Sequence, residues 1–280
     1  MGNKRFFTVM LKFSKMALFG LGTLGFLGLT SSPTRAVELA SYQAGYQARL
    51  SDTRDQAVVS AVSGQIAYGF EQSCEGLIFQ QSGALNWHFA NGNVASQVLY
   101  FSSLEQKQTY QFTVKTEGMT QEVILGRAEM PSTGEAGEVQ FARPKAKAFP
   151  LPAGTLFPAA HTRLMIESAL AGKTQFQSHI FEGTDVEGSK LLVVFISPMS
   201  EAGKMIQKDL GGDFANHQGW NFRMAYFDPK SQTSEPQYEV DVDQLDNGIA
   251  LRWMLDYATH AVEMKMVKVE QIKNPDCSAQ

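Results

Sequence analysis

The sequence predicts a mainly β protein, a curled antiparallel sheet with one principal helix packed against it. Three observations support this fold class. The region after residue 36 alternates apolar and polar residues far more than it follows a helical period. Only two segments have helical spacing, and one of them is strong. A late Asn247-Gly248 pair, which tolerates the positive φ of a tight turn, predicts a hairpin.

Residues 1–36 have the organisation of a secretory signal peptide. Four basic residues, Lys4, Arg5, Lys12 and Lys15, precede an apolar stretch from Met16 to Leu29. This stretch is too short for a helix that crosses about 30 Å of hydrocarbon. Small residues in Thr34-Arg35-Ala36 predict cleavage near Ala36, which leaves 37–280 as a single domain. An uncleaved N-terminal anchor is the alternative. We expect a periplasmic protein with no membrane span after cleavage.

Cleavage would leave an acidic protein. The chain has 24 Lys and Arg and 28 Asp and Glu, and residues 1–36 contain five of the basic residues and none of the acidic ones. The remaining 19 basic and 28 acidic residues give a net charge of −9. Such a surface argues against a nucleic-acid partner and against adsorption to anionic lipid.

The alternating segments predict a long series of strands. In chain order they are 94–101, 108–115, 121–130, 138–142, 175–181, 191–196, 221–227, 238–242, 249–257 and 261–272. In the stretch from Val262 to Val269 the charged and apolar residues largely fall on opposite faces, as in a half-buried antiparallel strand. Residues 143–154 contain three prolines and predict an extended connector that is not a domain boundary.

Two helices are expected between the strands. The stronger covers residues 158–171, with Pro158 in the first turn and Gly172 as its stop. Its predicted buried face consists of His161, Leu164, Met165, Ala169 and Leu170. A shorter helix is expected over residues 199–210, ended by two glycines.

Two cysteines, Cys74 and Cys277, are an even set with a single possible pairing. An exported chain enters an oxidising compartment, so we favour an intramolecular disulfide. Two free thiols and an intermolecular bridge are the alternatives. A redox-active pair is not expected, because the sequence has no Cys-x-x-Cys spacing.

No pattern predicts catalysis, a metal or a cofactor. No Gly-x-Ser-x-Gly elbow is present, and the glycine-rich match at residues 20–25 lies inside the apolar stretch of the signal. The five histidines have no metal-ligand spacing. Asp241 and Asp243 share one strand face, for which a solvated edge is the expected environment.

A ligand site is predicted from aromatic residues and one histidine. If the sheet curls, apolar surface left over on its concave side would line a pocket for a lipid-like ligand. His161 could hold a ligand head group, although a satisfied, half-buried histidine is the plainer interpretation. The other candidate contacts are Phe157, Trp220 and Trp253. Most aromatic residues, Tyr100 among them, are expected in the core.

Four stretches in this order resemble the cell-envelope integrity EipB family. They are Ala44 to Leu50, Val62 to Gly76, Leu151 to His161 with the later Phe181-Glu-Gly183, and Tyr238 to Leu255. One departure is Leu77, where the family pattern has tryptophan. The resemblance implies a broken β-spiral, a disulfide between the two cysteines and a periplasmic role in envelope integrity. It implies no enzymatic activity.

The sequence therefore predicts a non-enzymatic periplasmic protein that supports envelope integrity, acting by binding an envelope protein partner through an edge strand or an exposed surface. The alternative is a carrier of a lipid-like ligand in an internal cavity. An enzyme that acts on envelope polymer has the least support, because no acid/base pair or nucleophile is identifiable.

Overall fold

The computed structural model describes residues 37–277, with gaps at 55–57, 133, 232 and 258. The predicted signal peptide, residues 1–36, lies outside the described residues. The first eight strands are β1 (Tyr42–Thr53), β2 (Val59–Gln72), β3 (Leu77–Phe89), β4 (Val94–Glu105), β5 (Thr109–Gly118), β6 (Glu122–Glu129), β7 (Gly137–Arg143) and β8 (Lys147–Leu151).

The second half of the chain supplies six strands and the helices. The strands are β9 (Gln175–Ile180), β10 (Lys190–Pro198), β11 (Gly219–Phe227), β12 (Tyr238–Leu245), β13 (Ala250–Asp256) and β14 (His260–Gln271). The helices are α1 (Pro158–Leu170), α2 (Glu201–Leu210) and the short 3-10 helix η1 (Gly212–Asn216).

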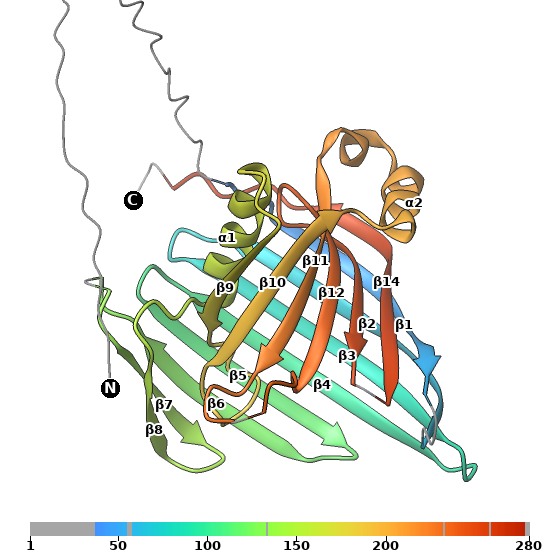
Figure 1. Ribbon diagram of the computed structural model, residues 1–280, viewed down its shortest axis with the longest axis horizontal. Coiled ribbons are helices and arrows are strands. Elements are labelled where there is room, and N and C mark those ends of the chain that lie inside the picture. The colour runs from blue at the N-terminus through green and yellow to red at the C-terminus, as the bar shows by residue number, and fades with distance from the viewer. Residues whose placement is uncertain (1–36, 55–57, 133, 232, 258, 278–280) are drawn as a thin grey trace, which may run out of the picture. The chain divides into compact units, whose positions relative to one another are not determined.

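All fourteen described strands form one antiparallel sheet that folds back on itself, with β9–β14 in front of β2–β6 (Figure 1). The order is β8-β7-β6-β5-β4-β3-β2-β1-β14-β13-β12-β11-β10-β9, so the first and last strands pair near its middle. The sheet is not closed, and its edges are β8 and β9. The chain crosses between these edges through α1, and Leu156 forms a parallel bridge to Ile180. This architecture confirms the predicted curled antiparallel sheet.

Alternation along the strands produces the core. In β1, Tyr42, Ala44, Tyr46 and Ala48 are buried, and the residues between them face outward. Such inward residues from both halves of the sheet form the core clusters. The predicted Asn247-Gly248 turn joins β12 to β13, and Gly248 has φ of 86°, which favours glycine.

The principal helix begins at Pro158 as predicted and ends at Leu170, one residue early. His161, Met165 and Ala169 are buried, in agreement with the expected face. Leu170 is 54% exposed, so its predicted burial was wrong. The helix turns this last residue away from the sheet.

Strands β1 and β2 lie in stretches that carry the family resemblance, whereas β3 and β8 were missed in the sequence. In β3 the inward positions include Gln81 and Gly83, which interrupt the apolar alternation. β8 lies within the predicted proline-rich connector. Pro150 is tolerated there because β8 is an edge strand that pairs with β7 alone, so one side of its backbone needs no ladder donors.

A disulfide joins Cys74 to Cys277 across 203 residues of sequence. Cys74 lies in the turn between β2 and β3, and Cys277 lies six residues beyond the end of β14. Asn274 adds side-chain hydrogen bonds to Ser41 and Gln72 near the same place. The C-terminal segment is therefore held against the ends of β1 and β2.

Candidate functional site

The N-terminus of α1 is held by a carboxylate from the opposite half of the sheet. Glu105, at the end of β4, accepts hydrogen bonds from the backbone N–H groups of Ala159 (2.7 Å) and Ala160 (2.8 Å). Phe157 precedes the helix and offers no side-chain cap, so Glu105 satisfies donors that a cap would otherwise take. Burial raises the pKa of Glu105, and the two N–H groups partly oppose that shift.

The aromatic residues beside this junction connect β5 to the segment that follows β9. The ring of Phe157 stacks on Tyr110 of β5 at 5.2 Å between centroids. The hydroxyl of Tyr110 donates to the backbone carbonyl of Glu182, just beyond β9 (2.9 Å). Gly183 has φ of 71°, and a Cβ there would lie 2.5 Å from the Phe112 ring. The Phe157-to-His161 and Phe181-to-Gly183 stretches thus meet in one packed region.

Two titratable groups in this region have pKa values far from their ordinary range. His161 is 2% exposed, and burial lowers its pKa from 6.5 to about 4. Within the described residues its Nε2 atom has no hydrogen-bond partner. Burial raises the pKa of Glu182 from 4.5 to about 7, although the Tyr226 hydroxyl donates to its carboxylate. Both side chains are therefore mostly neutral near pH 5.5.

These two groups should have opposite effects on stability between pH 4.5 and 6.5. The unfolded state binds the His161 proton more tightly, so this group makes the unfolding free energy rise with pH. The folded state binds the Glu182 proton more tightly, so that group makes it fall. Across this window each effect is about 2 kcal/mol. Glu182→Gln removes the falling effect, so its unfolding free energy should rise with pH more steeply than that of wild type. His161→Gln removes the rising effect, so its unfolding free energy should fall with pH relative to wild type.

Urea unfolding at pH 4.5, 5.5 and 6.5 measures these slopes. The double variant is the control, because it should restore a slope near that of wild type. If the Glu182→Gln slope equalled that of wild type, Glu182 would titrate normally in the folded protein.

The four predicted ligand contacts do not share one site. Trp220 lines a pocket of about 480 Å³ together with Met199 and Lys204, near α2. Trp253 lies on the inner face of β13, with its ring parallel to Tyr68 at 6.3 Å. Phe157 and His161 are packed in the core. A ligand-binding role for these residues stays a prediction.

The carboxylate of Asp243 is fully buried, so the expected solvated edge was wrong for this residue. It accepts hydrogen bonds from Ser200 N–H (3.0 Å), Ser200 Oγ (2.5 Å) and Asn221 Nδ2 (3.1 Å), and Arg252 lies at 3.4 Å. Ser200 in turn caps α2. The helix covers Asp243 closely, because a Cβ on Gly203 would lie 2.8 Å from it.

Metal binding has no geometric support in the described part of the chain. No three His, Cys, Asp or Glu side chains among those residues are grouped closely enough to hold an ion. Among the same residues, no helix has the length and apolarity to cross a membrane.

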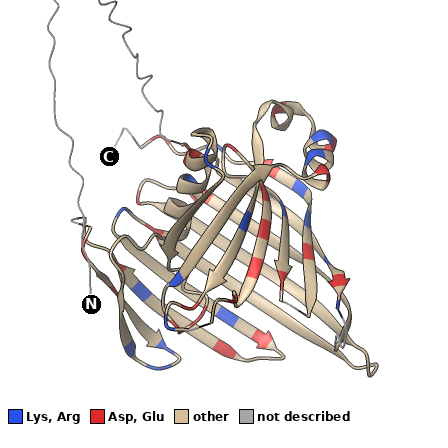
Figure 2. Cartoon of the chain, in the orientation of Figure 1, with Lys and Arg blue, Asp and Glu red and all other residues tan. Residues whose placement is uncertain are grey.

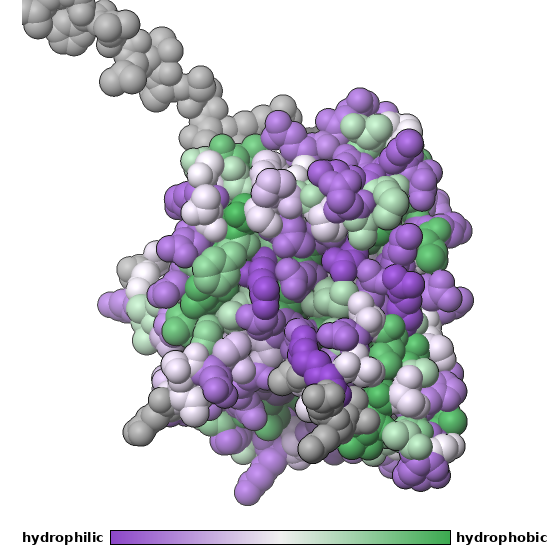
Figure 3. Space-filling model, turned by 45° about the vertical axis from the view of Figure 1, so that its right-hand side comes forward, coloured by the Kyte–Doolittle hydropathy of each residue, from purple (hydrophilic) through white to green (hydrophobic). Residues whose placement is uncertain are grey.

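Strand β10 is apolar on both faces. Leu192 and Val194 point inward and are fully buried. Leu191, Val193 and Phe195 alternate with them on the outer face, and Phe227 of β11 pairs beside Leu191. These four outward residues are called the β10 strip. Phe195 is 46% exposed, and the space-filling view shows apolar patches of this kind interrupting a mostly polar surface (Figure 3).

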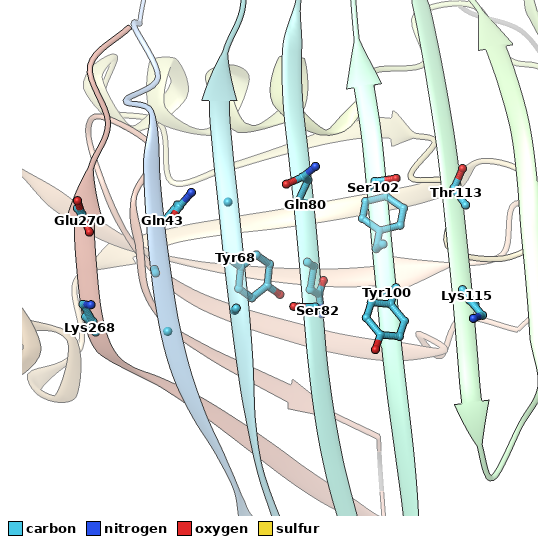
Figure 4. Close-up of a pocket in the computed structure, with 16 residues that line it drawn as sticks. Gln43, Tyr68, Gln80, Ser82, Tyr100, Ser102, Thr113, Lys115, Lys268 and Glu270 are labelled. Atoms are coloured by element: carbon cyan, nitrogen blue, oxygen red, sulfur yellow. The ribbon is translucent and has the colours of Figure 1, made fainter.

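A second surface feature is a trough of about 650 Å³ over strands β14 and β1 to β5 (Figure 4). Outward side chains line it, and this set is called the outer trough. Tyr100 belongs to it and is 48% exposed, so it is an exception to the core position expected for most aromatic residues. Residues 98–101 are all apolar or aromatic, which leaves the face of each undetermined by sequence.

Comparison with known proteins places the chain in one protein family. A family model described as EipB-like matches residues 33–273. The cell envelope integrity protein EipB of Brucella abortus (strain 2308) is 25% identical over 250 residues, which are 88% of this chain and 89% of that protein. The crystal structure of a β-barrel-like protein of the domain of unknown function DUF1849 from Brucella abortus aligns with a TM-score of 0.78 at 22% identity. That alignment covers 85% of this chain and all of the other.

Proposed function

This chain belongs to the EipB-like family, and on that premise we propose that it supports cell-envelope integrity without catalysis, by binding an envelope protein partner. The envelope role is that of the Brucella relative named for it. We place the protein in the periplasm after removal of residues 1–36, because these residues have the organisation of a signal peptide.

The β10 strip is the observation that carries the partner proposal. An antiparallel strand with one face on the core normally has polar residues on its other face. β10 instead has Leu191, Val193 and Phe195 there, and this strip has the composition of a surface that another molecule covers. The ion pair between Arg223 and Glu239 lies beside it on the same face. An apolar centre with a charged border is typical of protein interfaces.

Strand addition at a sheet edge is less suited to this partner. β8 is only five residues long and contains Pro150. Natural edge strands use these features to prevent pairing. The last residues of β9 already pair with Leu156. The backbone N–H of Leu156 donates to the His179 carbonyl, and its own carbonyl accepts from the Phe181 N–H. We therefore propose contact through the face of β10.

Phe195→Glu should abolish the envelope function and leave folding intact, because the side chain lies outside the core. The test is growth of a deletion strain under detergent stress when complemented with each variant, beside the thermal midpoint of the purified protein. Val94→Glu is the matched control, since Val94 is 57% exposed at the start of β4. A photo-crosslinking residue at position 195 should give an adduct with one envelope protein. Full complementation by Phe195→Glu would contradict the proposal.

The lipid carrier is the second candidate, and a different observation favours it. Leu85, Trp87, Trp253 and Leu255 pack on the inner side of the sheet but remain partly exposed. Such apolar surface suits an acyl chain. Native mass spectrometry of protein purified from the periplasm separates the candidates, because a carrier would retain a ligand of acyl-chain mass and Phe195→Glu would not release it.

A further inference from the structure

We infer that the outer trough binds a linear polysaccharide of low charge that carries N-acetylated sugars. The trough lies over β14 and β1 to β5, whereas the β10 strip lies on β10 and β11. The inference therefore goes beyond the proposed protein partner and does not depend on it.

Strand register aligns the trough across six strands. One row runs Lys268, Gly45, Ala67, Ser82, Tyr100 and Lys115, each paired with the next. The neighbouring row runs Glu270, Gln43, Gly69, Gln80, Ser102 and Thr113 in the same way. Five inter-strand spacings give a length of about 24 Å. Glycine, alanine and serine form the floor, so an extended chain of several sugar rings could lie along it.

The centre of the trough, over β2, β3 and β4, has no charged side chain in its lining. Strands β2, β3 and β4 contain only two charged residues, Glu71 and Glu105, and Glu105 points inward to α1. Figure 2 shows these strands almost entirely without charged residues, whereas charges are frequent on β12, β14 and α2. The charged residues of the lining, Lys115, Lys268 and Glu270, lie at its two ends on β5 and β14. The uncharged centre matches a ligand of low charge.

The polar groups in the trough are available to a ligand. Within the described residues, the side chains of Gln43, Gln80, Ser82, Ser102 and Thr113 form no hydrogen bond with the protein. Figure 4 shows them on neighbouring strands. Amides and hydroxyls both donate and accept, as sugar hydroxyls and acetamido groups do. The chemistry of the lining therefore suits a glycan.

Tyr100 supplies the aromatic surface that sugar recognition uses. Its ring lies on the outer face and is 48% exposed, between Ser82 and Lys115 in the row. The C–H groups of a pyranose ring pack against such a face, while the sugar's hydroxyls remain free for the amides nearby. Lysines at both ends of the row can meet occasional carboxylates on the chain.

Other ligand classes fit the trough less well. An acyl chain needs an apolar lining. A peptide that adds as a strand needs unpaired backbone, and every strand under the trough is paired on both sides. A nucleic acid needs a basic surface, and Glu270 offsets one of the two lysines.

The test uses the mature protein and the hexasaccharide of N-acetylglucosamine, followed by isothermal titration calorimetry and saturation-transfer NMR. We expect saturable binding at one site. Tyr100→Ala should bind about tenfold more weakly, and Tyr100→Phe should bind like wild type because the ring remains. Absence of binding by the wild-type protein, or unchanged binding by Tyr100→Ala, would overturn the inference.

A variant that adds a side chain inside the trough separates loss of binding from loss of folding. A Cβ at Gly69 would lie 3.9 Å from Gln43 Cγ and 4.0 Å from Gln80 Cβ, which is ordinary contact. Gly69→Val should therefore keep or raise the thermal midpoint and still block the hexasaccharide. Gln47→Ala, on the same face outside the trough, is the control and should bind normally. Equal affinity for cellohexaose would overturn the assignment to N-acetylated sugars.

Hexasaccharide binding by Phe195→Glu distinguishes the trough from the proposed protein-binding face of β10. Phe195→Glu should bind the hexasaccharide like wild type, because residue 195 lies on β10 and outside the trough. Loss of hexasaccharide binding in that variant would contradict a separate site.

Discussion

Cys74→Ser should lower the free energy of unfolding by about 3–5 kcal/mol, because the bond closes a loop of some 200 residues in the unfolded chain. Besides the disulfide, the C-terminal segment is held by hydrogen bonds that include those of Asn274 with Ser41 and Gln72. Without the bond, this segment should detach and become sensitive to protease. Urea unfolding and limited proteolysis under non-reducing conditions measure both effects.

The double variant Cys74→Ser/Cys277→Ser separates loss of the bond from effects of a new free thiol, and it should match the single variant. The wild-type protein unfolded with reductant should approach the same value. A loss below about 1 kcal/mol would mean that neither the loop constraint nor the attached segment contributes to stability.

Asp243→Ala should lower the free energy of unfolding by about 3–5 kcal/mol, since it removes one charge from a buried, paired network. Ser200 and Asn221 would lose their acceptor, and the N-terminus of α2 would lose its support. Arg252 would keep its bond to Glu263 (2.6 Å), which limits the loss at that residue. Guanidinium unfolding of the mature protein measures the change.

Asp241→Ala is the matched control, because Asp241 lies two residues earlier on the same strand face and is only partly buried. We expect a change below about 1 kcal/mol there. Asp243→Asn should lower the free energy of unfolding less than Asp243→Ala does, because the amide oxygen can still accept a hydrogen bond from Ser200. Equal losses at Asp241 and Asp243 would contradict the role assigned to the buried network.

Local patterns predicted most of the sheet and the principal helix, but not the face of every residue. The run from Val98 to Phe101 has no polar member, so alternation could not place Tyr100 on the outside. The same applies to β10, where the apolar run indicated a strand but not an uncovered face. Gln81 and Gly83 hid β3 because they interrupt its apolar alternation. Gly83 lies at a close approach, where a Cβ would come within 2.9 Å of Ile66.

The candidate sites were harder to predict because they depend on contacts between distant segments. Asp243 is buried only because α2 packs over it, and no local pattern reports that contact. Glu105 reaches the N-terminus of α1 across more than fifty residues of sequence. The outer trough needs the register of six strands, which is set by the whole sheet and by no single motif.

Pairing of the first strand with the last has a consequence for how the chain is made. Tyr42 of β1 lies opposite Gln271 of β14, so the pair near the middle of the sheet cannot form until nearly the whole chain is present. Until then β1 is an open edge, which is prone to pair with other chains. Contacts this distant in sequence also form slowly. A chain that emerges from its N-terminus can therefore form its sequential hairpins early, but it cannot join the two halves of the sheet until the last strand arrives.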